Sequence, residues 1–441
     1  MTFLQNLKKG RSQLVFVGAL LSASALILVL ENRGVDLQEA PAIPRINAVI
    51  AKANPLPVAE PRKISQKEYE QARIAWKYFE NNTNAETMLV NSANGYPSTT
   101  IWDTGSYLIG LISAHRLGIV DTQEFDHRMK GALNSIAKLE LFDGVLPNKA
   151  YDVRTLKMAS YDNKRDERGL GWSTLDVSRF LVPLAYVLRN HPEHAGSVET
   201  VLSRWDLSRL VKDGEMVGTA VKDGETVLRQ EGRVGYEQYG AKAMMMFGLD
   251  AVQATQAGRN ADFREMREVD LPVDKRSMGG GSAFVTSEPY MLDGLDFGFD
   301  SISHALASNV YQVQEKRFQE TGIPTAVSES HISEAPYFVY STIWGGGDEW
   351  AVMRLDGTRY DEKRTLSTKA AFAWDALFAT DYTKTLVRSI NTLADPEKGW
   401  MEGRYELDGS PNTSITCNTN GVVLAAIAFK EFGPLMRHRV K

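Results

Sequence analysis

Two glutamates in the segment QEGRVGYEQYGAKA are the first residues whose type and spacing suggest chemistry. Glu231 and Glu237 lie six positions apart, with two glycines between them. On one continuous helix their side chains would point roughly 240° apart, because each residue advances about 100°. Gly232 and Gly235 suit a non-helical approach instead, which leaves Glu231 on a loop and Glu237 in the first turn of a helix over 236–247. We therefore expect both carboxyl groups to line one mouth.

Acidic and aromatic residues recur wherever a loop rich in Gly, Trp, Asp or Asn enters an apolar helix. Aromatic faces stack on sugar rings and carboxylates bond sugar hydroxyls, so this composition suits a glycan cleft. Glycoside hydrolysis commonly requires a carboxylic acid that protonates the leaving oxygen and a carboxylate that activates water or attacks the sugar. We expect Glu231 to be the general acid, with Glu237 and Glu288 as candidates for the base or for positioning water. The expected substrate-binding residues are Trp102, Asp103, Trp172, Asp176, Tyr236, Tyr290, Glu329 and Trp400.

Most of these side chains also have a purely structural alternative. Glu288 precedes Pro289 and is expected in extended backbone. The alternatives are a helix cap for Asp103, Asp293 and Asp296, a core position for Trp102 and Trp172, an ion pair with Arg229 or Arg233 for Glu231, hydrogen bonds to neighbouring helix starts for Glu237, and an exposed loop for Glu329.

Other kinds of site find less support in the sequence. The seven histidines include no HExxH pair, and His191 and His194 fall in a proline-containing turn, which argues against zinc. The stretch RSMGGGSAF lacks the Lys-Ser/Thr of a phosphate-binding loop, and no G-x-S-x-G elbow occurs. DGLDFGFD lacks the spacing of an EF-hand, and structural calcium remains a minor alternative. Carboxylate chemistry requires no metal or cofactor, so we expect none.

Six segments with similar beginnings predict six helices that are apolar on most faces and therefore buried. They are 102–118, 171–188, 235–249, 293–314, 366–382 and 418–433. The intervening helices, which include 65–82, 122–142, 194–211 and 381–394, show one apolar stripe and are expected to be peripheral. This alternation predicts an all-α (α/α)6 toroid, an inner ring wrapped by an outer ring. An irregular helical domain or a helical solenoid is the alternative.

A small β-hairpin is expected on the rim of the toroid. The stretches 336–344 and 350–355 are β-prone, and Gly345–Gly347 separate them.

Bulk composition excludes several classes of protein. The chain has 441 residues, 43% of them hydrophobic, which is enough for one large core or two ordinary ones. The net charge is -5 and no Lys/Arg block interrupts the body of the chain, so nucleic acid is not an expected partner. The single Cys417 excludes a disulfide framework within the chain.

The first 34 residues differ from the rest. Lys8, Lys9 and Arg11 precede the apolar stretch 14–30, which reaches the lower limit of a membrane span. We expect a signal anchor over 1–34, a proline-containing linker over 35–64 and the toroid over 65–441. This predicts a single-pass protein of the bacterial inner membrane with its main domain in the periplasm. The small residues 22–25 leave a cleaved signal peptide as the alternative.

Eight ordered motifs resemble the bacterial family of domains of unknown function numbered 3131. They are WDTGSYLIGLISAHRLGI, LPNKAYD, GLGWSTLDVSRFL, QEGRVGYEQY, SEPYMLDGLDFGFD, TAVSES, LSTKAAFAW and NTNGVVL, spread over roughly 65–433. That family is distantly similar to the six-hairpin, glucoamylase-like glycosidases, which include endo-β-1,2-glucanases and the glucan-processing domain of cyclic β-1,2-glucan synthases. The resemblance implies the toroid and a glycan substrate.

The sequence thus favours a membrane-tethered periplasmic glycoside hydrolase or transglycosylase that acts on a glucan or exopolysaccharide. Its expected partners are an oligo- or polysaccharide and, through the anchor, the inner membrane. A non-catalytic glycan-binding or scaffold component of an envelope polysaccharide machinery is the second hypothesis. A polysaccharide lyase ranks third, because an acid-rich rim would repel uronate substrates.

Overall fold

The computed structural model describes residues 43–278, 281–282 and 284–437. The chain divides into two units, residues 1–48 and 49–441. Within the first unit, only the start of α3 (Ile43–Lys52) is described. The second unit holds all the other elements.

The predicted location in the bacterial inner membrane is corrected. Across residues 43–278, 281–282 and 284–437, every helix is too short or too polar to cross a bilayer. The segment 14–30, predicted as the anchor, lies outside the described residues. The single-pass assignment, and with it the periplasmic main domain, is therefore not retained.

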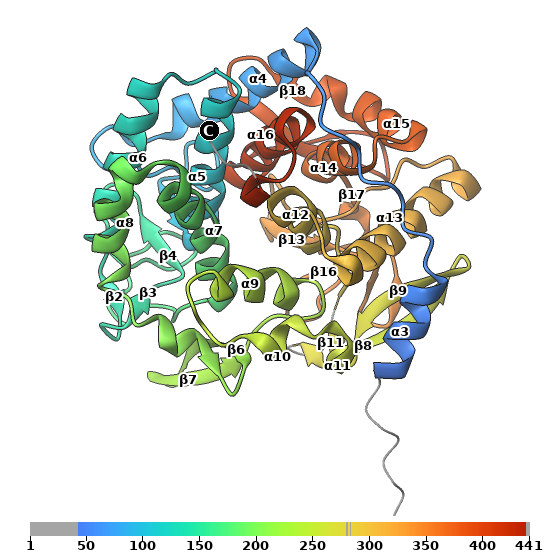
Figure 1. Ribbon diagram of the computed structural model, residues 1–441, viewed down its shortest axis with the longest axis horizontal. Coiled ribbons are helices and arrows are strands. Elements are labelled where there is room, and N and C mark those ends of the chain that lie inside the picture. Colours follow the sequence, from blue (N-terminus) through green and yellow to red (C-terminus); the bar gives the residue numbers. More distant parts are fainter. Residues whose placement is uncertain (1–42, 279–280, 283, 438–441) are drawn as a thin grey trace, which may run out of the picture. The chain divides into compact units, whose positions relative to one another are not determined.

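Six helices form a closed inner ring, seen nearly end-on in Figure 1. Each contacts the next along the chain, and the last contacts the first. These helices are α5 (Ile101–Arg116), α7 (Thr174–Asn190), α9 (Tyr236–Met245), α12 (Glu288–Phe297), α14 (Thr368–Phe378) and α16 (Cys417–Phe432). Their side chains are buried almost all round, as their apolar composition requires. The predicted helical toroid is confirmed.

An outer layer of helices covers the inner ring (Figure 1). It comprises α4 (Gln66–Asn82), α6 (Thr122–Ile136), α8 (Ala195–Leu202), α13 (Ser301–Thr321) and α15 (Asp381–Ile390). Between α9 and α12 the chain forms two short helices, α10 (Val252–Thr255) and α11 (Ala257–Asn260), and then a β-hairpin. The outer layer is therefore only partly helical in this sector.

The prediction of one inner helix over 293–314 is wrong. The segment contains the end of α12 and the start of α13, separated by Gly298 at φ 74°. A left-handed glycine ends α12, and Asp300 caps α13 through the N–H groups of Ile302 and Ser303. Apolar residues on both sides of this break concealed the change from an inner to an outer helix.

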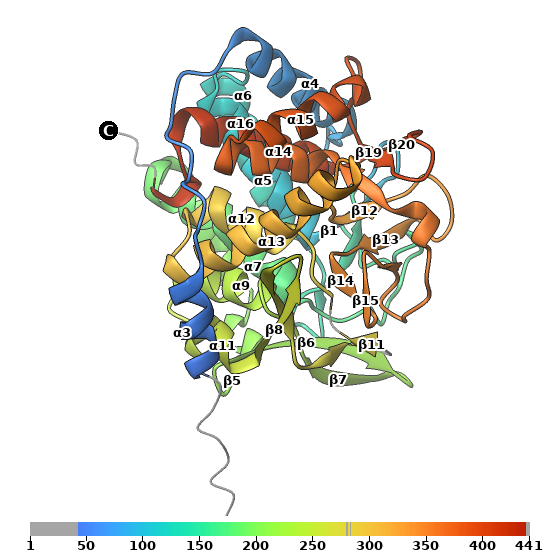
Figure 2. The ribbon, with the colours of Figure 1, turned by 90° about the vertical axis from the view of Figure 1, so that its right-hand side faces the viewer.

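Strands gather at one end of the ring, beside the starts of the inner helices, as Figure 2 shows for β1, β12, β13 and β19. The strands that precede α9 are β1 (Ser98–Thr100), β2 (Leu141–Phe142), β3 (Leu146–Pro147), β4 (Ala150–Asp152), β5 (Val211–Lys212), β6 (Glu215–Lys222) and β7 (Glu225–Gln230). Those that follow are β8 (Ala261–Met266), β9 (Val269–Asp274), β10 (Ser277–Met278), β11 (Gly281–Ser282), β12 (Glu329–His331), β13 (Phe338–Ser341), β14 (Trp344–Gly345), β15 (Asp348–Glu349), β16 (Val352–Met353), β17 (Thr365–Ser367), β18 (Ala394–Asp395), β19 (Gly399–Tyr405) and β20 (Pro411–Ile415).

All strand pairs among the described residues are antiparallel and short. The predicted hairpin exists: β13 pairs with β16, and β12 adds a third strand. The strands β17, β18 and β20 all pair with β19. The hairpins β6–β7 and β8–β9 carry the chain into α9 and toward α12. These strands connect the starts of the inner helices.

The segment after α3 lies along the toroid in an extended conformation. The N–H of Leu56 donates to Ser308 Oγ, that of Ala59 to the carbonyl of Leu377, and that of Arg62 to the carbonyl of Lys430. The second half of the predicted linker is thus bound to three helices.

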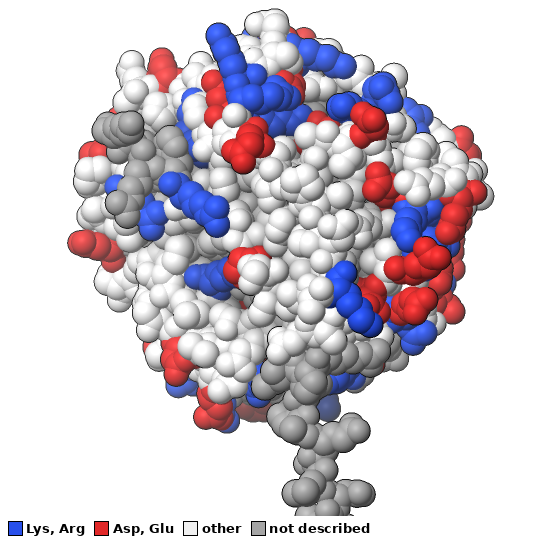
Figure 3. Space-filling model, turned by 45° about the vertical axis from the view of Figure 1, so that its right-hand side comes forward, with Lys and Arg blue, Asp and Glu red and all other residues white. Residues whose placement is uncertain are grey.

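Charged residues on the face shown in Figure 3 are of mixed sign. Lys and Arg lie among Asp and Glu, and no continuous basic patch is visible on this face.

Small residues allow the inner helices to pack closely. A Cβ placed on Gly421 of α16 would lie 2.6 Å from the backbone oxygen of Ser106 in α5. We therefore expect Gly421→Ala to lower the free energy of unfolding by about 1–3 kcal/mol, because two backbones must separate. Urea unfolding measures the change. Gly196→Ala, at a helical position with open space around it, is the control and should cost nothing.

Candidate active site

The starts of the inner helices converge on one end of the ring. Glu288 at the start of α12 accepts a hydrogen bond from Asn418 of α16 at 2.7 Å and pairs with Lys369 of α14 at 2.6 Å. Ser106 of α5 donates to Asn418 Oδ1 at 2.8 Å. The rings of Trp102 and, at the start of α9, Tyr236 lie 6.0 Å apart. Residues distant in sequence therefore meet, as the toroid requires.

Glu231 lies against the first turn of α7. Its Oε1 accepts a hydrogen bond from Ser173 Oγ at 2.7 Å, and its Oε2 accepts one from the N–H of Thr174 at 2.6 Å. Gly218 of β6 leaves room for this carboxyl group, because a Cβ there would collide with Oε2. Burial raises the pKa of Glu231, while Ser173, Lys149 and the Thr174 amide oppose the shift. Glu231 as a whole residue is partly exposed.

Asp176 shares a hydrogen-bonding partner with Glu231. Ser173 Oγ lies 2.9 Å from Asp176 Oδ1 and also bonds Glu231, so one hydroxyl joins the two carboxyl groups. Burial and then the charge of Glu231 raise the pKa of Asp176 to about 7. Lys149 lowers this pKa, and Asp103 raises it further. An acid that is half protonated near neutral pH is suited to proton transfer.

Two tyrosines border this pair of acids. Tyr161 is 65% exposed, yet burial of its hydroxyl raises its pKa, and Asp176 and Glu231 raise it further. Burial also raises the pKa of Tyr340, with contributions from Glu329, Tyr161, Asp176 and Glu231. Tyr340 therefore lies among acids that come from three separate parts of the chain. Neither tyrosine stood out in the sequence.

Asp103 and Glu329 are two further acids at this end of the ring. Asp103 Oδ2 accepts hydrogen bonds from Ser92 and, at 2.7 Å, from Thr100, and no described residue bonds its Oδ1. Burial raises the pKa of Glu329, and Lys369 opposes the shift. We call Asp103, Asp176, Glu231 and Glu329 the acid cluster.

Glu288 is fully buried beside Glu329, since Ser328 Oγ lies within bonding distance of both carboxyl groups. Lys369, Ser328 and Asn418 satisfy its two oxygens. It begins α12 rather than lying in extended backbone, with Pro289 in the first turn. Its ion pair leaves no place for a water molecule or sugar to approach, so we do not assign it to catalysis.

Asp296 is sealed in the centre of the ring. It pairs with Arg179, and the Tyr239 hydroxyl donates to it at 2.8 Å. Tyr239 in turn accepts from Arg179 at 2.6 Å. Asp293 is likewise buried and pairs with Lys242 at 2.6 Å. Both aspartates lie inside α12 and do not cap a helix.

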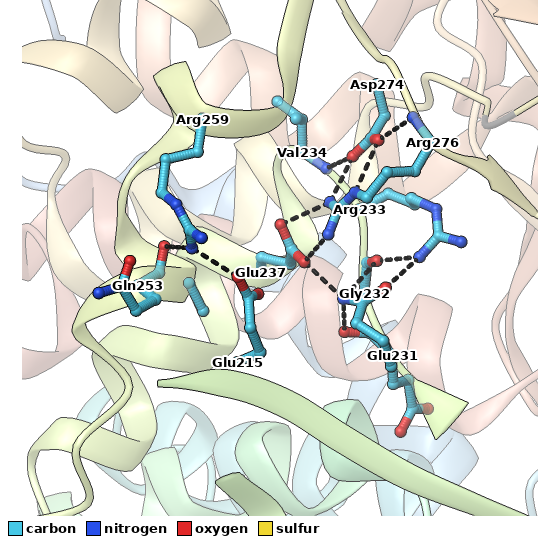
Figure 4. A network of polar contacts seen from close by, with 12 residues as sticks. Glu215, Glu231, Gly232, Arg233, Val234, Glu237, Gln253, Arg259, Asp274 and Arg276 are labelled. Carbon is cyan, nitrogen blue, oxygen red and sulfur yellow. Dashed lines mark hydrogen bonds and ion pairs between the residues drawn. The ribbon is translucent and has the colours of Figure 1, made fainter. Parts of the chain in front are cut away.

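Glu237 belongs to a different network from Glu231, as Figure 4 shows. It is 1% exposed and forms a bidentate pair with Arg276, with both distances 2.7 Å. Arg276 also pairs with Asp274. In Figure 4 the Glu231 carboxyl group points away from this network. The expectation that both glutamates line one mouth is therefore not met, although Gly232 and Gly235 have positive φ, which fits the predicted non-helical approach to the helix.

We expect Glu237→Gln to affect stability rather than turnover. The amide loses one charge-assisted contact to Arg276, which costs about 1–3 kcal/mol. Urea unfolding should detect this loss, while the kcat of the folded variant stays within about threefold of the parent protein. A much larger loss of kcat would show that Glu237 takes part in the reaction.

The predicted aromatic residues divide into two groups. Trp102 and Tyr236 are partly exposed near the acid cluster. Trp172, Tyr290 and Trp400 are buried, and the indole N–H groups of the two tryptophans donate to the carbonyls of Val217 and Gln71. Buried rings cannot stack on a sugar, so we assign these three to the core.

The residues that sequence reasoning missed around the acid cluster are Lys149, Tyr161, Ser173, Tyr340 and Lys369. Ser173 carried a usable signal, because it precedes a helix and suits an N-cap. The others reach the site through loops and strand pairing, which leave no local pattern.

One group of described residues has ligands suited to a metal ion. Asp126, Glu193 and His194 place one ligand atom each within 4.8 Å of one another. His194 follows the C-terminal end of α7, whereas Ser173 caps the start of the same 17-residue helix. That helix is about 25 Å long, so this group lies remote from the acid cluster.

Comparisons with known proteins agree with the fold. An endo-β-1,2-glucanase from Chitinophaga pinensis superposes with a TM-score of 0.59 at 11% identity, covering 85% of this chain and 95% of the glucanase. An endo-β-1,2-glucanase from Talaromyces funiculosus gives 0.58 at 11% identity, covering 84% of each chain. At these identities the likeness shows a shared fold alone. The chain matches none of the curated proteins with which it was compared. The family model described as "Protein of unknown function (DUF3131)" matches residues 70–433, so the chain belongs to that family.

Proposed function

We propose that the protein is a glycoside hydrolase or transglycosylase that cleaves a neutral glucan, with Glu231 as the general acid. One observation carries the proposal. Glu231 is a partly exposed residue whose carboxyl group has a raised pKa and is held in a fixed position by Ser173 and the Thr174 amide. A positioned acid of raised pKa can protonate the glycosidic oxygen as the bond to the leaving sugar breaks.

Asp103 is our candidate for the opposing carboxylate. Two hydroxyl groups hold its Oδ2, and Oδ1 has no partner among the described residues. A carboxylate held in this way can accept a proton from a water molecule that attacks the sugar. Glu329 then binds sugar hydroxyls, and Trp102 and Tyr236 supply partly exposed aromatic faces. Glu237 and Glu288 hold the structure through their ion pairs.

Charge favours a neutral substrate. Four carboxyl groups form the acid cluster, and the nearby Lys369 is already paired with Glu288. A uronate-containing chain would meet like charge there. The structural neighbours that act on β-1,2-glucan make this linkage the first to test.

The test is an assay of the purified protein on β-1,2-, β-1,3-, β-1,4- and α-1,4-glucans and on a uronate-containing polysaccharide. Release of shorter oligosaccharides from one neutral glucan supports the proposal, and formation of longer products identifies transglycosylation. Glu231→Gln must lower the rate of glucan cleavage by a factor of about 10² or more, which excludes a contaminating enzyme. Saturable binding of a glucan without turnover at any pH between 4 and 9 would favour the non-catalytic alternative and contradict the enzyme proposal.

A further inference from the structure

Ser173 has more hydrogen-bond partners than its single proton can serve. Its oxygen accepts from the N–H of Asp176 at 3.1 Å and lies within bonding distance of Asp176 Oδ1 and Glu231 Oε1. A serine hydroxyl donates one hydrogen bond and accepts two. If both carboxyl groups were ionised, one of them would face the lone pairs of Ser173 without a proton between them. All three oxygen atoms have a hydrogen-bond partner when Asp176 and Glu231 together hold one proton.

We propose that Asp176 is a positioning residue that stores the proton delivered by Glu231, and that Ser173 transfers it between them. This inference rests on the proposed role of Glu231. In one state, protonated Asp176 donates to Ser173 Oγ, and Ser173 donates to ionised Glu231. In the other state, the Asp176 proton has moved to Ser173 Oγ and the Ser173 proton to Glu231 Oε1.

The exchange conserves protons and charge. One O–H bond breaks at Asp176 and one forms at Glu231, while Ser173 exchanges one proton for another. The pair carries a single negative charge throughout. The Thr174 N–H at the start of α7 stabilises the ionised state of Glu231, and transfer of the proton readies Glu231 to protonate the leaving oxygen.

Other charged and titratable groups near Asp176 and Glu231 shift the pKa values of these two acids. Lys149, on the loop before β4, lowers the pKa of both carboxyl groups, whereas Asp103 of α5 raises that of Asp176. Tyr161 and Tyr340 stay protonated, because their pKa values are raised. The two acids therefore titrate as a coupled pair, with apparent pKa values that belong to both.

Thermal unfolding of Asp176→Asn at several pH values tests whether Asp176 stores a proton. This test does not require the protein to cleave a glucan. The folded pKa of Asp176 is raised from 3.8 to about 7. Protonated Asp176 therefore stabilises the folded protein fully below the pKa that Asp176 has in the unfolded chain. This stabilisation is lost as pH rises through 7. The asparagine does not ionise. The Tm of the variant relative to the parent protein should rise by a few degrees between pH 5 and pH 8.

Asp381→Asn is the matched control, because its side chain is fully exposed. Its Tm difference should change by less than about one degree between pH 5 and pH 8. A Tm difference for Asp176→Asn that is also independent of pH would overturn the storage of a proton, and it would do so even if no glucan were cleaved.

The pH–rate profile tests the delivery of the proton. In Asp176→Asn the basic limb of kcat should move to lower pH by about one unit, with activity partly restored at low pH, because Glu231 must then take its proton from solvent. Ser173→Ala should also lower kcat, since the transfer path is broken. An unmoved limb in Asp176→Asn would contradict the transfer, whereas absence of cleavage by the parent protein would contradict the proposed function instead.

Discussion

Replacing Glu231 with glutamine is expected to lower kcat by a factor of about 10²–10⁴, the usual contribution of a general acid. The amide has nearly the same shape, and its oxygen can still accept from the Thr174 N–H. It cannot give a proton to the leaving oxygen. KM should change by less than about threefold, because sugar contacts in the ground state remain. Initial rates over a range of glucan concentrations separate the two constants.

Substrates with activated leaving groups sharpen this test. An aryl glycoside with an acidic phenol needs little protonation, so Glu231→Gln should lose much less activity on it than on the natural glucan. Glu329→Gln is the matched control at the same end of the ring, and it should mainly raise KM. Equal losses on both substrates would show that Glu231 does not act as the acid.

Replacing Arg179 with methionine is expected to lower the free energy of unfolding by about 3–5 kcal/mol. Arg179 is fully buried and bonds Asp296, Tyr239 and Ser106 at the centre of the ring. Removal of the guanidinium leaves Asp296 charged in the core without its partner. Denaturant unfolding monitored by tryptophan fluorescence measures the loss.

A second substitution distinguishes lost charge pairing from lost packing. Asp296→Asn in the Arg179→Met background removes the unpaired charge, so it should restore a large part of the lost stability. The same change alone should destabilise the parent protein. If the double variant were no more stable than Arg179→Met, packing rather than charge would explain the loss.

Much of the fold could be predicted because the helix patterns are local. A helix buried on all faces must be apolar all round, and α5 and α16 show this directly in their sequences. The boundary at Gly298 could not be placed, because the residues before and after it are equally apolar and only the left-handed backbone separates them. The hairpin β6–β7 had a signal in its Asp223-Gly224 turn, but its strands alternate weakly.

The candidate site was less predictable, because its contacts are tertiary. Glu231 could be singled out as a carboxylate on a loop between glycines. Its partner Ser173 lies 58 residues earlier, and nothing in either segment indicates that they meet. For Glu237 the local sequence was misleading. It suggested a catalytic site, but Arg276, which follows β9, forms an ion pair with the Glu237 carboxylate. Residue type identified the candidate acids, and only the packing of the helices showed which of them meet.

A crystal structure of Glu231→Gln soaked with a glucan oligosaccharide tests the central claim most directly. We expect two adjoining sugar rings at the starts of the inner helices, with their linking oxygen within hydrogen-bond distance of the residue-231 amide and Asp103 on the other side of the bond. Sugar bound only elsewhere on the molecule, or with its linkages out of reach of residue 231, would contradict the account.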